Sequence, residues 1–174
     1  SFAILVGAIS LLPVIIYPFM KRITYWPQLF LGIAFNWGAL LGWAAAAGEL
    51  PPPAFLLYLA GIFWTLGYDT IYAHQDKEDD ALIGVKSTAL KFGGQSRRAI
   101  AIFYGCATGL FALAGWQAGM GPGFWPVLVV AGGHLTWQVM RLEIDKPDKC
   151  LHLFRSNRDF GAILFAAILA GLAT

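Results

Sequence analysis

Hydrophobic residues form long, nearly uninterrupted stretches along this chain, and the polar residues gather in the connections between them. A helix needs about 20 predominantly apolar residues to cross the hydrocarbon core of a bilayer. Proline cannot donate a backbone hydrogen bond, so Pro13 and Pro18 should bend the first such stretch. The pattern predicts an all-α, polytopic transmembrane helix bundle, a single domain over residues 1–174, with six helices at 2–20, 27–47, 53–73, 99–118, 124–140 and 160–172.

The composition agrees with a chain that lies largely inside a lipid bilayer. Hydrophobic residues make up 58% of the 174 residues and charged residues 13%. Soluble domains contain about 45–50% apolar and about 25% charged residues, so these values predict an integral membrane protein. The formal net charge of +2 gives no reason to expect nucleic acid as a partner.

The basic residues indicate the orientation of the predicted helices. All 12 lysines and arginines fall in alternate connections, which follow the first, third and fifth helices. The other two connections, "GELPPP" and "QAGMGPG", hold one acidic residue and no basic residue. By the positive-inside rule, the charged connections face the cytoplasm at a bacterial inner membrane or, as the alternative, the matrix at a mitochondrial inner membrane. Both ends of the chain are then expected on the opposite side.

The stretch "YDTIYAHQDKEDDALIGVKS", residues 68–87, holds five acidic residues and two lysines directly after an apolar run. If the third helix continues through it, Asp69, Tyr72, Asp76 and Asp80 lie on one face, because they are spaced by three, four and four. Asp69 lies near the membrane boundary, where a carboxylate is costly unless it meets a cation or water. Stacked carboxylates also repel one another, and a divalent cation would relieve that repulsion.

Carboxylates without a set of cysteines or histidines favour a hard cation over a soft one. Mg²⁺ commonly binds one or two carboxylates together with substrate phosphates. Lys86, Lys91 and the pair Lys21–Arg22 are expected on the same membrane face, where they could stabilise a departing diphosphate. A solvated loop of mixed charge is an alternative interpretation, and an ion-coupled transporter is another. However, transporters usually place their sites at the midplane, not at one mouth.

This stretch resembles the second aspartate-rich motif of the intramembrane aromatic prenyltransferases, the UbiA superfamily, and within it the subfamily that prenylates 4-hydroxybenzoate in ubiquinone biosynthesis. The Tyr-Asp-Thr start, the spacing of Asp76 and Asp80, and the Gly-x-Lys-Ser close carry the resemblance. "YPFMKR", followed by "PQLFLGIAFNWG", resembles the fourth membrane segment and the next helix of that subfamily. "FRSNRDFG" resembles the entry to its final helix, so the resemblance spans the chain in order.

The resemblance implies a Mg²⁺-dependent enzyme that transfers a polyprenyl group from polyprenyl diphosphate to 4-hydroxybenzoate, at the ring carbon ortho to the hydroxyl. It further implies partners among the proteins of ubiquinone biosynthesis. The implied metal ligands are three aspartates, which also belong to the catalytic set. The implied catalytic residues are Asp69, Asp76, Asp80, Lys21 and Arg22, and the implied substrate-binding residues are Tyr17, Tyr72, Lys86 and Asn157.

The sequence departs from the family in one respect. Members carry a first motif, Asn-Asp-x-x-Asp-x-x-x-Asp, on an earlier helix, and these 174 residues contain no such motif. Members also have nine membrane helices, so the chain resembles their C-terminal two-thirds. It begins at Ser1 and is apolar from Phe2, and we expect a native N-terminus upstream and no activity from this chain alone. A non-enzymatic transporter or assembly protein, or a prenyltransferase with another aromatic acceptor, remain the alternatives.

Overall fold

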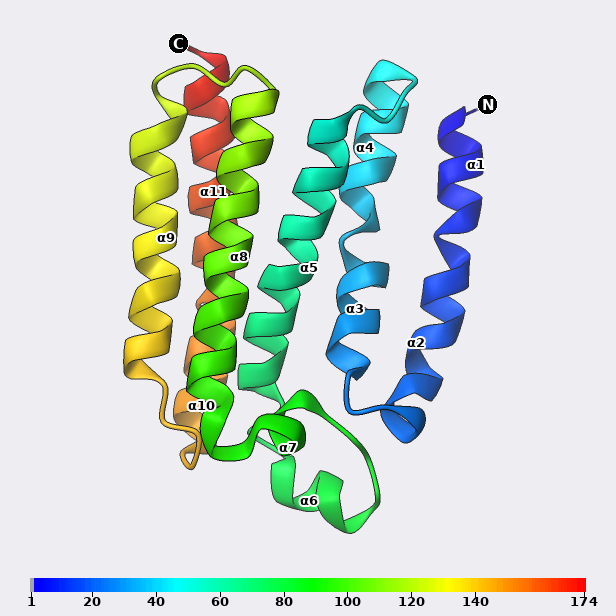
Figure 1. The fold of residues 1–174 in the computed structure, drawn as a ribbon, viewed down its shortest axis with the longest axis vertical. Coiled ribbons are helices and arrows are strands. Elements are labelled where there is room, and N and C mark those ends of the chain that lie inside the picture. Colours follow the sequence, from blue (N-terminus) through cyan, green and yellow to red (C-terminus); the bar gives the residue numbers. More distant parts are fainter. Residues whose placement is uncertain (1) are drawn as a thin grey trace.

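The computed structural model describes residues 2–174, whose helices run side by side along one axis (Figure 1). Three pairs of consecutive helices, α1–α2, α3–α4 and α10–α11, each continue in one direction, so these residues form six antiparallel rods. Short helices lie in the connection between α5 and α8. The helices are α1 (Phe2–Ile9), α2 (Leu11–Ile23), α3 (Pro27–Phe35), α4 (Trp37–Ala47), α5 (Pro52–Tyr72), α6 (Lys77–Leu82), α7 (Thr88–Phe92), the 3₁₀ turn η1 (Gly93–Gln95), α8 (Ser96–Gln117), α9 (Phe124–Arg141), α10 (Pro147–Arg155) and α11 (Asn157–Leu172).

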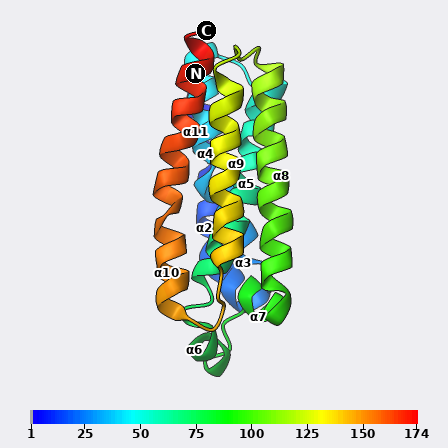
Figure 2. The same cartoon turned by 90° about the vertical axis from the view of Figure 1, so that its left-hand side faces the viewer.

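Four helical stretches among these residues are long and apolar enough to cross a membrane: Phe2–Ile23, Pro27–Ala47, Pro52–Tyr72 and Thr88–Gln117. The predicted all-α membrane bundle is therefore confirmed. The other two predicted spans correspond to α9, with 18 residues, and α11, with 16 residues. Figure 2 shows α10 and α11 stacked end to end beside α9, so that together they reach the length of the neighbouring rods.

The first rod is interrupted at Ser10, one turn before Pro13. Pro13 lacks the N–H that would bond to the carbonyl of Ile9, so the helix cannot continue unbroken through this point. The hydroxyl of Ser10 donates to the carbonyl of Gly7 at 2.6 Å, which satisfies its polar atom inside an apolar segment. The helix α2 then continues through Pro18 to Ile23.

The second rod is interrupted at Asn36, which the apolar pattern did not predict. The Asn36 side-chain amide donates to the carbonyl of Gly32 at 2.9 Å and to the hydroxyl of Thr65, on α5, at 2.8 Å. Gly61 makes this approach feasible, because a Cβ atom at that position would lie 2.3 Å from Oδ1 of Asn36. The hydrogen bond from Asn36 to Thr65 therefore links the break in the second rod to α5.

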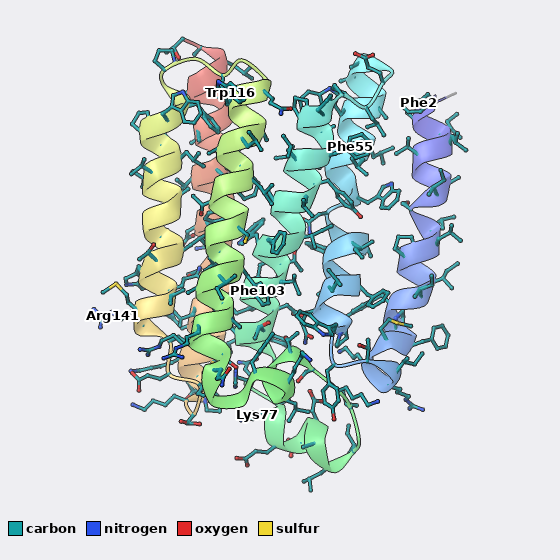
Figure 3. The ribbon with its side chains drawn as sticks, viewed as in Figure 1. Phe2, Phe55, Lys77, Phe103, Trp116 and Arg141 are labelled. Atoms are coloured by element: carbon teal, nitrogen blue, oxygen red, sulfur yellow. The ribbon has the colours of Figure 1, made fainter. Side chains whose placement is uncertain are left out.

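Charge separates the two ends of the bundle as the sequence predicts. Figure 3 shows Lys77 and Arg141 at the end that carries α6, α7 and the start of α10, and Phe55 and Trp116 toward the other end. The two connections without basic residues and both ends of the described chain lie at that second end (Figure 1). We therefore refer to the end that carries α6 and α7 as the charged end.

The helix α5 lies in the middle of the bundle and packs against α3, α4, α8 and α10. Its bounds agree with the predicted 53–73 to within one residue, and Pro52 and Pro53 fill its first turn, where a missing N–H is harmless. Ala60, Thr70 and Ile71 are fully buried along it. This packing on several sides fixes the residues at its charged end.

Candidate functional site

The predicted site residues of α2 and α5 meet at the charged end of the bundle. Lys21 follows Tyr17 by one helical turn, and Asp69 lies in the last turn of α5. Lys21 lies close enough to Asp69 and Asp80 for its charge to act on both carboxylates. Asp69 in turn acts on Tyr17. The structure therefore brings Tyr17, Lys21, Asp69 and Asp80 near one another, and Lys21 and Arg22 are both exposed at the end of α2.

The acidic stretch does not form one continuous helix, so the predicted single face of Asp69, Tyr72, Asp76 and Asp80 is wrong. The helix α5 ends at Tyr72, and α6 begins at Lys77. In the turn between them, the amides of His74 and Gln75 bond three residues back, to the carbonyls of Ile71 and Tyr72. The chain turns here because it leaves the apolar bundle, where α5 is packed, and enters water, where stacked carboxylates repel.

The turn nevertheless keeps the aspartates near one another. Partial burial raises the pKa of Asp80, and the negative charges of Asp76 and Asp79 raise it further, while Lys21 acts in the opposite direction. Residues 2–174 contain no group of three or more carboxylate, histidine or cysteine side chains gathered closely enough to hold a metal. The oxygen donors fit Mg²⁺ as an ion shared with phosphate oxygens, since Mg²⁺ takes only one or two carboxylates in such sites.

Lys86 links the charged connection to the end of α2. Its backbone N–H donates to the carbonyl of Lys21 at 2.8 Å, and its Nζ donates to the carbonyl of Ile23 at 3.1 Å. The same Nζ lies 5.5 Å from the ring centroid of Tyr25. Gly84, with φ of +73°, lets the chain reverse just before this contact. The backbones of Lys86 and Lys21 are therefore held side by side at the end of α2.

A ladder of aromatic side chains runs along α5 beside the aspartates. Trp64, Tyr68 and Tyr72 recur every four residues and so share one face of the helix. Tyr68 and Tyr72 pack against Phe154 of α10, with centroid distances of 5.8 Å and 4.6 Å. Trp64 packs against Phe160 of α11 at 4.8 Å. The predicted substrate residue Tyr72 is thus part of a larger aromatic surface, which we call the α5 ladder (Trp64, Tyr68 and Tyr72).

Asn157 lies in a buried hydrogen-bond network, not at an open surface. Its Oδ1 accepts from the indole N–H of Trp64 at 2.8 Å, and its amide donates to the carbonyl of Phe154 at 3.1 Å. Gln138 of α9 accepts from the hydroxyl of Tyr104 at 2.6 Å and from Asn157 at 3.4 Å. Its own amide donates to Ser156 at 3.0 Å. Asn157 therefore positions the α5 ladder through Trp64.

On the other side of the acidic turn, a polar cavity of about 250 Å³ is lined by residues that include His74, Lys77 and Asp145. His74 is buried, and its Nε2 lies 2.8 Å from the hydroxyl of Ser96 on α8. Burial lowers the pKa of His74 to about 4, and Lys77 adds to this effect while Asp145 opposes it. The contact between the neutral imidazole of His74 and Ser96 therefore links the turn between α5 and α6 to α8.

Two residues near the site were not identified from the sequence. Asn36 and Thr65 lie one turn deeper than Asp69 and Tyr68, and the hydroxyl of Thr65 donates to the hydroxyl of Tyr68 at 3.2 Å. The available signal was a lone asparagine within an apolar span, because polar residues inside membranes are rare and often functional.

Comparison with known proteins places the chain among membrane prenyltransferases. Residues 1–171 match the sequence model of the UbiA prenyltransferase family. The chain is 50% identical over 171 residues to a protein of Bos taurus named 4-hydroxybenzoate polyprenyltransferase, mitochondrial, which covers 98% of the chain and 46% of that protein. Proteins of the same name from Arabidopsis thaliana and Drosophila melanogaster are 48% and 53% identical, over 98% and 97% of the chain and 42% and 43% of their own lengths.

The chain thus spans less than half the length of these relatives. No solved structure matches the chain.

Proposed function

Because the chain belongs to the UbiA prenyltransferase family, we propose that the protein transfers a polyprenyl group from polyprenyl diphosphate to the ring carbon ortho to the hydroxyl of 4-hydroxybenzoate, a step of ubiquinone biosynthesis. The observation that carries the proposal lies at the charged end, where the charge of Lys21 on α2 acts on both Asp69 of α5 and Asp80 of α6. The names of the curated relatives give the substrate and the acceptor.

The acidic side chains bind the diphosphate group through Mg²⁺ in this proposal. Asp69, Asp76 and Asp80 would be its protein ligands, one or two to each ion, and Mg²⁺ when bound would supply positive charge against the negative charge that develops on the departing diphosphate. Residues 2–174 contain no group of three carboxylate, histidine or cysteine side chains gathered closely enough to hold a metal alone, so the ion would be shared with phosphate oxygens.

The basic and aromatic side chains of the site orient the two substrates. Lys21 and Lys86 are held side by side and bind diphosphate oxygens. Arg22, at the exposed end of α2, binds a further oxygen or the benzoate carboxylate. Tyr17, on which the charge of Asp69 acts, and Tyr72, which is exposed at the end of α5, contact the polyprenyl diphosphate in this proposal. Asn157 acts through Trp64, which it holds at 2.8 Å.

The same residues favour one side of the membrane for the reaction. The charged end faces the cytoplasm of a bacterial inner membrane or the matrix of a mitochondrion, and the names of the relatives favour the mitochondrial inner membrane. Polyprenyl diphosphate then lies with its diphosphate at the charged end and its tail in the lipid.

Membranes that carry the complete protein with this sequence provide the test. With 4-hydroxybenzoate and a polyprenyl diphosphate, we expect a prenylated product that forms with Mg²⁺ and is lost after chelation. Asp76→Ala should abolish the product, whereas Asp148→Ala, an exposed carboxylate of α10 on the same side, should leave it unchanged. Product formation only with a different aromatic acceptor would contradict the proposed substrate, and unchanged product from Asp76→Ala would contradict the metal ligands.

A further inference from the structure

We propose that the ring of Tyr68 is a catalytic group, which stabilises the allylic cation formed as the polyprenyl diphosphate loses its diphosphate. This inference rests on the proposed prenyl transfer. In that reaction the bond between C1 and the diphosphate oxygen breaks, and both electrons leave with the diphosphate. The aromatic acceptor then supplies an electron pair to C1, a carbon–carbon bond forms, and the ring proton passes to water.

Tyr68 lies at the depth of the bundle at which we place C1, the first carbon of the prenyl chain. It directly precedes Asp69 in the last turns of α5, and the charge of Asp69 acts on it. A prenyl chain whose diphosphate is bound near Lys21 and Asp69 begins at this depth of the bundle. The first carbon of the chain therefore lies beside the ring of Tyr68, whereas later isoprene units lie further along the rods.

The Tyr68 ring is held in one orientation by contacts on several sides. It packs edge-to-face against Trp64, at 5.4 Å and 74° between planes, and against Phe154 at 5.8 Å. Its hydroxyl accepts from Thr65 at 3.2 Å, and the oxygen of Thr65 accepts from Asn36 at 2.8 Å. A ring that is oriented before the reaction needs no rearrangement when positive charge develops, which is the basis of electrostatic catalysis.

The other rings of the α5 ladder are less suited to this task. Trp64 lies one turn deeper than the aspartate, and its N–H is committed to Asn157. Tyr72 is 39% exposed, and an attraction between a cation and an aromatic ring is weak where water competes. A cation beside Tyr72 would also be open to capture by water. Tyr68 combines the right depth with partial burial, where the attraction is strongest.

The test replaces the Tyr68 ring in the complete protein and measures prenyl transfer under saturating substrates. Tyr68→Phe keeps the ring and loses only the contact with Thr65, so we expect kcat to fall less than about threefold. Tyr68→Leu removes the ring, and the loss of a desolvated cation–π contact predicts a fall in kcat of roughly 30-fold with KM little changed. Phe55→Leu removes a ring from the opposite end of the same helix, where Phe55 is exposed, and should leave kcat unchanged.

Fluorinated phenylalanines at position 68 separate a cation–π role from a packing role, because fluorine withdraws charge from the ring face with little change of shape. We expect log kcat to fall in proportion to the number of fluorine atoms, and the same series at Phe55 to be flat. A flat series at position 68 in an active enzyme overturns the role of Tyr68 and leaves the proposed function intact. Absence of any prenyl transfer by the unmodified protein overturns the proposed function itself.

Discussion

Replacement of Gln138 by leucine should weaken the bundle by disrupting the buried network that positions Asn157. Gln138 is fully buried on α9 and connects Tyr104 on α8 with Ser156 and Asn157 at the junction of α10 and α11. Leucine has a similar size, so the change leaves no large cavity. It leaves the hydroxyl of Tyr104 without an acceptor in an apolar surrounding.

The magnitude follows from the contacts of Gln138. A buried polar group left without its partner costs about 1–3 kcal/mol, so Gln138→Leu should lower the free energy of unfolding by about 2 kcal/mol. Tyr104→Phe removes the donor but leaves Gln138 its contact with Asn157, at 3.4 Å, and should cost about 1 kcal/mol. The double variant lacks both partners of this hydrogen bond. It should lower the free energy of unfolding by only about 1.5 kcal/mol, whereas the effects of the two single variants add up to about 3 kcal/mol.

The assay is reversible unfolding of the protein by SDS in mixed micelles, followed by circular dichroism, for all four members of the cycle. The expected coupling of about 1.5 kcal/mol lies near the upper end for hydrogen bonds between membrane helices, because both partners are almost fully buried. Additive effects, within about 0.3 kcal/mol, would refute the reasoning, since the two side chains would then act independently.

Three further experiments test other parts of the structure. Burial raises the pKa of the Cys150 thiol to about 11, and Asp145 adds to the effect. Alkylation of Cys150 by a water-soluble maleimide should therefore be negligible at pH 7 and increase only toward pH 11. Rapid labelling of Cys150 at pH 7 would contradict its burial. Gly61→Ala places a methyl group against Asn36 and should lower stability by about 1–3 kcal/mol, whereas Gly42→Ala, in open space, should not; equal melting temperatures would show that Asn36 moves freely. Lys86→Met should raise the KM for polyprenyl diphosphate about tenfold, with product formation at saturation largely kept; an unchanged KM would remove this lysine from the diphosphate site.

The sequence was sufficient for the spans and for the separation of charge between the two ends of the bundle. The bounds of α5 and α9 agree with the predicted helices to within one residue, because long apolar stretches leave few alternatives in a membrane. The separation of the connections with basic residues from those without them likewise depends only on the order of residues along the chain. The prediction that Lys21 shares a membrane face with the aspartates follows from that order, and in the structure the charge of Lys21 acts on Asp69 and Asp80.

The site could be predicted only in part, because its remaining features depend on contacts between distant segments. Asp76 leaves the face of Asp69 because α5 ends at Tyr72, and that end involves the contact of His74 with Ser96. The spacing of residues within 68–87 cannot predict this contact, because Ser96 lies outside that stretch. The role of the α5 ladder likewise depends on Phe154, which reaches it from α10, a helix that the apolar pattern did not reveal.

The distribution of charge between the two ends of the bundle has a consequence for the biogenesis of the protein. Of the two connections that must be translocated across the bilayer, one carries Glu49 as its only ionised side chain and the other carries none. The reverse orientation would move all 12 basic residues through lipid, and a membrane potential of about 100 mV, negative on the charged side, opposes each of them by about 2.3 kcal/mol. The electrical work of insertion therefore favours the orientation with the charged end on the negative side of the membrane before the helices pack.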